Sequence, residues 1–270
     1  MNLRAVRAIV VKDLSVVRHS KAVLIPLIVV PLVMLLVLPA LAAFAPSYAN
    51  LPGAGDMTGL LERLPATMQA RLAPYTEDER VVVLLLKYLF APTYLILPLM
   101  VASVLAADAF AGERERRTLE ALVYTPTTDG ELLLGKLLSG FVPALAVAWG
   151  GFIVYAVVAN LAAWPTLGRV FFPDGMWFVL ALWVAPAVAA MGIGATVVVS
   201  SKVSTFQEAY QIGAVVVLPI VLLVVGQAAG VVVLSTGFVV ALGAVFWVVA
   251  VVLLHYGART FRRGELMARS

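Results

Sequence analysis

The sequence contains no cysteine, only two histidines and few charged residues. Without cysteine in its 270 residues, the chain can form neither a disulfide bridge nor a thiolate metal site. His19 and His255 are far apart in the sequence, and neither an HExxH zinc motif nor a GxSxG nucleophile motif is present. The sequence therefore predicts no catalytic, cofactor-binding or metal-binding residue in this chain.

The scarcity of charge limits the class of protein. Charged residues make up 13% of the chain and hydrophobic residues 63%, and the mean hydropathy is +1.03. Such a chain has too little polar surface to cover a soluble globule, so we predict an integral membrane protein in contact with lipid. The net charge of +4 does not indicate nucleic-acid binding, because the basic residues gather at the ends of apolar runs and form no continuous basic face.

Long apolar runs fill most of the chain. Each is about 20 residues or longer, the length that a helix needs to cross a bilayer. The expected fold is therefore an all-α integral membrane protein, with six transmembrane helices in one domain over residues 1–270. Prolines in the first span predict kinks rather than breaks, and a tight glycine-rich bend joins the last two spans. The predicted spans are residues 22–44, 81–107, 137–162, 176–199, 212–234 and 236–257.

The N-terminal segment, residues 1–21, is basic and amphipathic. Its apolar side chains fall within one narrow sector of a helical wheel, and its arginines lie beside that sector. This pattern predicts an interfacial helix that lies on the membrane rather than crossing it, although a basic leader that only sets topology fits equally well. The apolar residues are Leu3, Val6, Val10, Leu14 and Val17.

The distribution of lysine and arginine predicts the topology. Six spans place both termini on one side of the membrane, and 14 of the 19 basic residues fall in the segments on that side. Because cytoplasmic segments carry the excess of basic residues, we expect a multi-pass protein of the cell membrane, with both termini and residues 108–136 in the cytoplasm.

Residues 45–80 form the only sizeable loop on the extracytoplasmic side. Leu61, Leu64, Met68 and Leu72 repeat at helical spacing, which predicts a small amphipathic helix on the outer surface. This helix either closes the outer face or contacts substrate, and the first interpretation is favoured. Lys87, near the start of the second span, is expected to extend outward as an anchor.

The densest charge lies in residues 108–136, between the second and third spans. Leu119, Leu122 and Val123 form an apolar helical stripe there, which predicts a short amphipathic helix. Pro126 predicts a turn after it, and Thr128 with Glu131 forms a capping box that begins the next helix. A surface helix with charges of both signs suits docking into a groove on a soluble partner. Its carboxylates Glu113, Glu115 and Glu120 are expected to be solvated and paired with arginines.

One motif resembles a nucleotide-binding loop. Residues 130–137, GELLLGKL, match a Walker A loop except at Leu137, where serine or threonine binds magnesium, and no buried strand precedes them. The capping box and the leucines instead predict a helix start. ATP and Mg²⁺, if used, must therefore be bound by another subunit.

The stretch from Val101 to Leu138 resembles the signature of permease subunits of ABC transporters of the second type (ABC-2-like, with the type V exporter fold). The pattern is ER..RTLE.LL.TP....E...GK. The six spans and the basic N-terminal helix also resemble this family's arrangement. The matching positions here are Glu113, Arg114, Arg116, Arg117, Thr118, Leu119, Glu120, Leu122, Thr125, Pro126, Glu131, Gly135 and Lys136.

The resemblance implies a function and its partners. The N-terminal helix would be the connecting helix, and residues 113–124 would be the coupling helix that contacts a separate ATPase subunit. Two permease chains, identical or paralogous, would form an export pathway driven by ATP hydrolysis in that partner. The alternative is an ATP-independent secondary transporter or channel. The residues expected to dock the ATPase are Glu113, Arg114, Glu115, Arg116, Arg117, Thr118, Leu119, Glu120, Leu122, Thr125 and Pro126.

Overall fold

The computed structural model describes residues 2–48, 61, 64–116, 127–203 and 205–260. Within these residues the regular structure is helical and no strand occurs. Six of the helices are long and apolar enough to cross a membrane, which confirms the predicted all-α, six-span fold. These spans, numbered 1 to 6 in chain order, are Val23–Ala43, Glu77–Glu115, Asp129–Leu167, Gly175–Ser200, Phe206–Ala228 and Thr236–Arg259.

Several spans are built from consecutive helical elements. The chain begins with α1 (Leu3–His19), and span 1 consists of α2 (Lys21–Leu32), η1 (Val33–Val37) and α3 (Leu38–Ala43), followed by α4 (Ala45–Tyr48). After α6 (Ala66–Leu72), span 2 consists of α7 (Glu77–Val83), η2 (Leu84–Leu89), α8 (Phe90–Tyr94), α9 (Ile96–Ala107), η3 (Asp108–Gly112) and α10 (Glu113–Glu115). Span 3 is the single helix α12 (Asp129–Leu167). Span 4 consists of α13 (Gly175–Val179), η4 (Leu180–Val184) and α14 (Ala185–Ser200). Span 5 consists of α15 (Phe206–Gly213), the 3₁₀ turn η5 (Ala214–Val217) and α16 (Leu218–Ala228), and span 6 is α17 (Thr236–Thr260).

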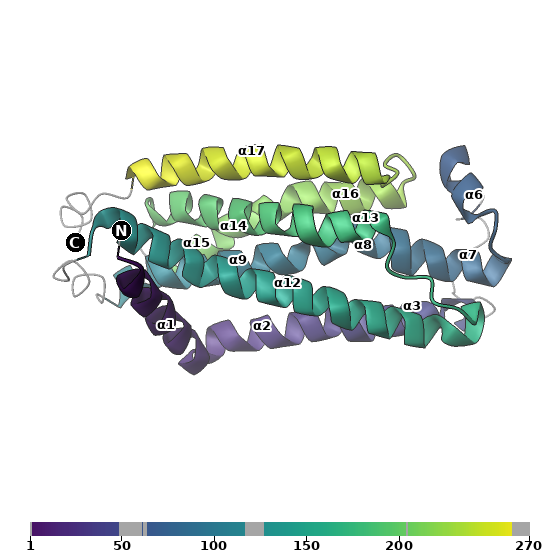
Figure 1. The fold of residues 1–270 in the computed structure, drawn as a ribbon, viewed down its shortest axis with the longest axis horizontal. Helices are drawn as coiled ribbons and strands as arrows, with labels where there is room; N and C mark the ends of the chain where they lie inside the picture. The colour runs from purple at the N-terminus through teal and green to yellow at the C-terminus, as the bar shows by residue number, and fades with distance from the viewer. Residues whose placement is uncertain (1, 49–60, 62–63, 117–126, 204, 261–270) are drawn as a thin grey trace.

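The spans run side by side along an elongated bundle (Figure 1). The start of α1 and the end of α17 lie at the same end of the bundle, whereas α6 lies at the opposite end. We call these the α1 end and the α6 end. An even number of crossings requires this arrangement of termini, and the charge distribution predicts that the α1 end is cytoplasmic.

Spans 2 and 4 form the centre of the bundle. In their most apolar windows 72% and 78% of residues are buried, against 17–22% in the other four spans. The outer spans thus expose wide apolar faces, as helices surrounded by lipid do. Glycines allow the central helix α14 to pack closely, because a Cβ at Gly192 would lie 2.8 Å from Leu99 Cδ1, and one at Gly194 would lie 2.9 Å from Leu253 Cβ.

Prolines within the spans alter the helices without ending them. Pro26 and Pro31 lie inside α2, which confirms that they do not break it. Pro39, Pro92 and Pro186 each follow a π-helical turn within three residues. Proline lacks an N–H and its ring crowds the carbonyl four residues earlier, so a wider turn just before it relieves that contact.

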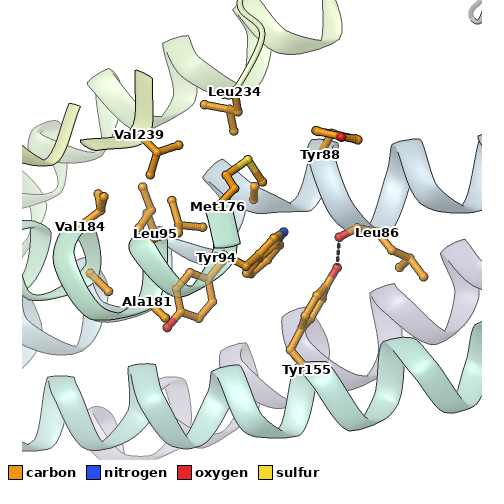
Figure 2. Close-up of a cluster of buried hydrophobic side chains, with 14 of the residues drawn as sticks. Leu86, Tyr88, Tyr94, Leu95, Tyr155, Met176, Ala181, Val184, Leu234 and Val239 are labelled. Carbon is orange, nitrogen blue, oxygen red and sulfur yellow. Dashed lines mark hydrogen bonds between the residues drawn. The ribbon is translucent and has the colours of Figure 1, made fainter. Parts of the chain in front are cut away.

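The π-helical turn η2 is stabilised by side chains from three other spans. The Tyr155 hydroxyl of span 3 donates to the Leu86 carbonyl at 2.5 Å, as Figure 2 shows. The Trp177 indole of span 4 donates to the Lys87 carbonyl, and the Gln227 amide of span 5 donates to the Tyr88 carbonyl, both at 2.7 Å. Irregular backbone at membrane depth needs such substitute donors. These three bonds therefore fix the half of span 2 nearer the α6 end against its neighbours.

The position and the partner of Lys87 differ from what the sequence predicts. Span 2 begins at Glu77 rather than Val81, so Lys87 lies ten residues inside the helix. Its ammonium group forms an ion pair with Asp174 at 2.9 Å, and its side chain is 15% exposed. A partner in the loop between spans 3 and 4 therefore takes the place of the expected contact with the membrane surface.

The predicted N-terminal helix forms, but its buried face is rotated from the apolar sector. Asn2 caps α1 by accepting from Arg4 N–H, and the extended backbone at Ser20 separates α1 from α2. Leu3, which belongs to the apolar sector, is 69% exposed, while Asp13 is buried. The reason is that Asp13 is bound by polar partners on α12, described below. That the helix lies in the membrane interface stays a prediction.

Candidate functional site

Six charged side chains from three segments meet at the α1 end of the bundle. They form what we call the charged junction: Lys12 and Asp13 of α1, Asp108, Glu113 and Arg116 at the end of span 2, and Lys136 of span 3. Three are acids and three are bases, so their formal charges cancel. Asp13, Asp108, Glu113 and Lys136 are each at most 6% exposed. A buried set of this kind is stable only when each charge has partners.

Glu113 bridges the three segments. One carboxylate oxygen accepts from Lys136 Nζ at 2.5 Å, and the other accepts from Lys12 Nζ. Lys136 is 0% exposed, and its ammonium group also donates to the Ala109 carbonyl at 2.5 Å. Because Lys12 lies on α1 and Lys136 on span 3, one carboxylate joins both elements to the end of span 2.

Two glycines make this close approach possible. A Cβ at Gly112 would lie 2.9 Å from Asp108 Oδ1, the atom that pairs with Arg116 at 2.9 Å. A Cβ at Gly135 would lie 2.9 Å from Ile9 Cβ, where α1 crosses span 3. A larger side chain at Gly112 would disturb the Asp108–Arg116 ion pair, and one at Gly135 would push α1 away from span 3.

Asp13 is the acidic residue of α1, and it is buried. Its Oδ2 accepts from Ser139 Oγ at 3.0 Å, and its Oδ1 lies 3.3 Å from Lys12 Nζ. Burial raises the pKa of the Asp13 carboxyl above its ordinary value, against the opposing effect of Lys136. For Lys12, burial lowers the pKa, but the hydrogen bonds and charges of Glu113 and Asp13 together outweigh it, so the net shift is upward. Asp13 and Glu113 also line a small cavity with room for about one water.

The next two residues of span 2 hold the loop between spans 4 and 5. Arg114 Nη1 donates to the carbonyls of Ser200 and Val203, at 2.8 and 3.0 Å. Glu115 accepts from Phe206 N–H at 2.9 Å, at the first residue of α15. A cation at the C-terminal end of one helix and an anion at the N-terminal end of the next are the favourable placements for helix dipoles. The end of span 2 therefore contacts both helices that flank this loop.

The start of span 3 is also tied to α1. The predicted capping box is present, since Thr128 N–H donates to Glu131 at 3.0 Å and Glu131 N–H donates to Thr128 Oγ1 at 3.3 Å. The second carboxylate oxygen of Glu131 accepts from Asn2 N–H at 2.5 Å. Both ends of the contact between α1 and span 3 are thus hydrogen-bonded.

The residues predicted to dock the ATPase divide into two groups. Glu113 is buried and turned toward Lys12 and Lys136, so the expectation that its carboxylate is solvated is wrong. Glu115 and Arg116 are exposed, and Arg114 is half-buried. The remaining positions lie outside the described residues, as does the predicted amphipathic helix. These are Arg117, Thr118, Leu119, Glu120, Leu122, Thr125 and Pro126.

Sequence reasoning did not predict that Lys12, Asp13 and Ser139 belong to this site. A signal was available for one of them, because Asp13 is the only acidic residue in the first 21 positions and lies beside the apolar sector of α1. Lys136 belongs to a Walker-like motif and to the family signature, but no structural role was predicted for it. In the structure its ammonium group is enclosed by protein atoms, and it is part of span 3.

The fold and this site define a multi-pass, all-helical membrane protein whose buried charged side chains, among the described residues, lie at one end. The sequence profile of the family described as ABC-2 family transporter protein matches residues 7–262. The chain therefore belongs to the ABC-2 transporter family. Members of this family are membrane transport components that are generally not catalytic themselves. Membership implies, in general, an ABC ATPase partner. No curated protein matches the chain at a significant level.

Proposed function

We propose that this chain is the permease subunit of an ATP-driven exporter. A separate ATPase subunit binds ATP and Mg²⁺ and docks on the segment that follows span 2, through residues 113–126. Two permease chains, identical or paralogous, pair in the cell membrane with their termini in the cytoplasm. The substrate moves through a pathway between the spans, and this chain carries out no chemistry.

The observation that supports this function best is the bridging position of Glu113. A partner that moves the segment after Arg116 would pull on the end of span 2 directly, because span 2 is helical as far as Glu115. Through Lys12 and Lys136 the same displacement would reach α1 and span 3. Through Arg114 and Glu115 it would reach spans 4 and 5. Four of the six spans and α1 are thus mechanically connected to one docking segment.

Burial of Glu113 assigns different tasks to the predicted docking residues. Its carboxylate is occupied by two lysines, so we assign Glu113 to transmission of movement within the chain. Contact with the ATPase then falls to the exposed residues Glu115 and Arg116 and to the segment from Arg117 to Pro126. Glu120, beside Leu119 in that segment, is the acid best suited to a contact with the partner.

The first experiment separates docking from transmission. A tagged chain is purified in mild detergent from its native membrane, and mass spectrometry identifies the subunits that accompany it. We expect a stoichiometric ATPase with the wild type, its loss with Glu120→Lys, and its retention with Glu113→Gln. Glu77→Lys is the matched control, because it reverses an exposed charge at the opposite end of the bundle.

A second experiment tests whether the spans move when the bound ATPase uses ATP. In Val170→Cys, an exposed site at the α6 end, maleimide labelling is compared with and without ATP. We expect ATP to change the labelling rate, and Glu113→Gln to remove that change while the ATPase stays bound. A chain that purifies without any ATPase would contradict the proposal and favour the ATP-independent secondary transporter or channel.

A further inference from the structure

A cavity lies at the α6 end, between the outer loop, span 2 and the bend between spans 5 and 6. Leu64 and Met68 line it from the outer loop, Leu84 and Leu89 from the turn η2, and Gln227 and Val232 from the end of α16 and the following bend. About 60 Å³ of this cavity admits the centre of a water molecule. One bound water needs about 10–15 Å³ of such space, so there is room for about four waters or for a ligand group of similar size.

The walls of the cavity are fixed by hydrogen bonds. Arg71 of α6 donates to the Leu234 carbonyl at 3.0 Å, which holds α6 against the bend. Within the bend, the N–H groups of Val231 and Val232 both donate to the Gly226 carbonyl, at 2.8 and 2.9 Å. Gly230 has a φ of 71°, a left-handed conformation that favours glycine and turns the chain back on itself. The cavity is therefore part of a defined structure.

Gln227 is the polar group of this cavity, and its amide oxygen has no partner. Its Nε2 donates to the Tyr88 carbonyl at 2.7 Å, which has no helical donor four positions later because that residue is Pro92. That bond fixes which way the amide points. Gln227 is 5% exposed, and its Oε1 is buried without a hydrogen-bond partner among the described residues. A buried acceptor left unpaired costs free energy that a bound donor would recover.

We propose that this cavity binds a neutral amphiphile whose hydroxyl or N–H group donates to Gln227 Oε1. The leucine, methionine and valine side chains would surround its apolar part. No charged residue is among the described residues that line the cavity, so an ionic headgroup would lose its hydration without gaining a partner. The proposal goes beyond the transport function and requires neither ATP nor an ATPase.

Photolabelling of the full chain in lipid vesicles tests this site. The probe is a long-chain alcohol that carries a diazirine on its alkyl chain, and the comparison probe is the same alkyl diazirine without the hydroxyl. A short, water-soluble diazirine alcohol added outside the vesicles distinguishes a ligand from the aqueous phase from one that enters through the membrane. Peptide mapping by mass spectrometry locates the adducts.

With the wild-type chain we expect the hydroxyl probe to label the segments around Met68 and Val232. Gln227→Met should lower that labelling at least fivefold and leave labelling by the hydrocarbon probe unchanged. Gln211→Met, the same substitution at an exposed position of span 5, should change neither. Because Gln227→Met also removes the side-chain bond to the Tyr88 carbonyl, Val233→Phe is a second variant, which fills the cavity and leaves the Gln227 bond in place.

Three results would overturn the proposal. Equal labelling by the two long-chain probes would mean that Gln227 recognises no donor. Labelling confined to lipid-facing helices would mean that the cavity holds only water. Undiminished labelling in Val233→Phe would place the bound probe elsewhere. None of these results depends on the ATPase, so the site and the transport function can fail independently.

Discussion

Lys136 shows how much depends on single side chains at the charged junction. It is completely buried, and its ammonium group bonds to Glu113 and to the Ala109 carbonyl. Removing one member of a buried ion pair leaves an uncompensated charge and costs about 3–5 kcal/mol, whereas removing both can be nearly neutral. The stability of the charged junction thus depends more on each charge keeping an opposite partner than on how many charges are buried.

This asymmetry gives a double-mutant prediction. We expect Lys136→Met to lower the thermal midpoint of the purified chain by several degrees, because Glu113 then loses its fully buried cationic partner. Glu113→Gln combined with Lys136→Met should recover most of the loss. Thermal unfolding followed by tryptophan fluorescence measures both, with the exposed Lys202→Met as the control. Additive losses in the double variant would show that the two side chains are not energetically coupled.

Asp13 gives a prediction about pH. Burial raises the pKa of its carboxyl in the folded chain above the unfolded value of about 3.9. Between those two pKa values the folded state binds more protons than the unfolded state, so stability falls as pH rises through that window. Asp13→Asn keeps an acceptor for Ser139 without the charge. We therefore expect it to be more stable than the wild type at pH 7–8, with the difference shrinking on acidification toward pH 4.

Measuring the thermal midpoints of the wild type and Asp13→Asn across this pH range tests whether the stability difference shrinks on acidification. Asp78→Asn is the control, because Asp78 is an exposed acid at the opposite end of the bundle. Lys12, Glu113 and Lys136 face Asp13 and contribute to its shift, so the variant must be compared with the wild type at each pH. A stability advantage that grows as the pH falls would contradict the assignment.

At the scale of elements, the contact between α1 and span 3 is decided by one glycine. A Cβ at Gly135 would lie 2.9 Å from two carbon atoms of Ile9, closer than carbon atoms pack, whereas one at Gly130 would meet no atom within 4 Å. We expect Gly135→Ala to destabilise the chain by about 1–3 kcal/mol through overpacking. Gly130→Ala, in the same helix, should be neutral or stabilising by about 0.5–1 kcal/mol.

Thermal unfolding of the two alanine variants makes this comparison directly. Both changes add one methyl group to α12, so helix propensity favours alanine in each and only the contact with α1 differs. If Gly135→Ala were as stable as Gly130→Ala, α1 would not pack against span 3 at Ile9. Its role in receiving movement from Glu113 would then have to be abandoned.

The elements also show which features the sequence predicts well. Apolar length and the Thr128–Glu131 capping box depend on local pattern, and both appear in the structure as expected. The buried face predicted for α1 is rotated by part of a turn from the observed one. A helical wheel treats Asp13 as a surface residue, because it cannot show the partners of Asp13 on span 3. Glu113 was misjudged for the same reason, since its two lysines are 101 and 23 residues away in the sequence.

At the scale of the whole molecule, the bundle has two chemically different ends. The α1 end holds the buried charged junction, while the α6 end holds tyrosine, tryptophan and glutamine side chains that donate to the carbonyls of η2. The two are joined by span 2, which runs from Glu77 to Glu115 and is among the most buried helices. A displacement applied at Glu113 would therefore act along a helix whose other half is hydrogen-bonded to three neighbouring spans.

The orientation of these ends in the membrane is the last prediction. Since the chain has no cysteine, single cysteines report accessibility without a background. Val170, which is 72% exposed, lies at the α6 end, and the exposed residue Gln207 lies at the α1 end. Each is replaced by cysteine in a separate variant. Neither change alters the basic residues that set topology. We expect a membrane-impermeant maleimide to label Val170→Cys in intact cells and Gln207→Cys only after permeabilisation. The reverse pattern would place the charged junction outside the cell, where no cytoplasmic ATPase could reach the segment that follows span 2.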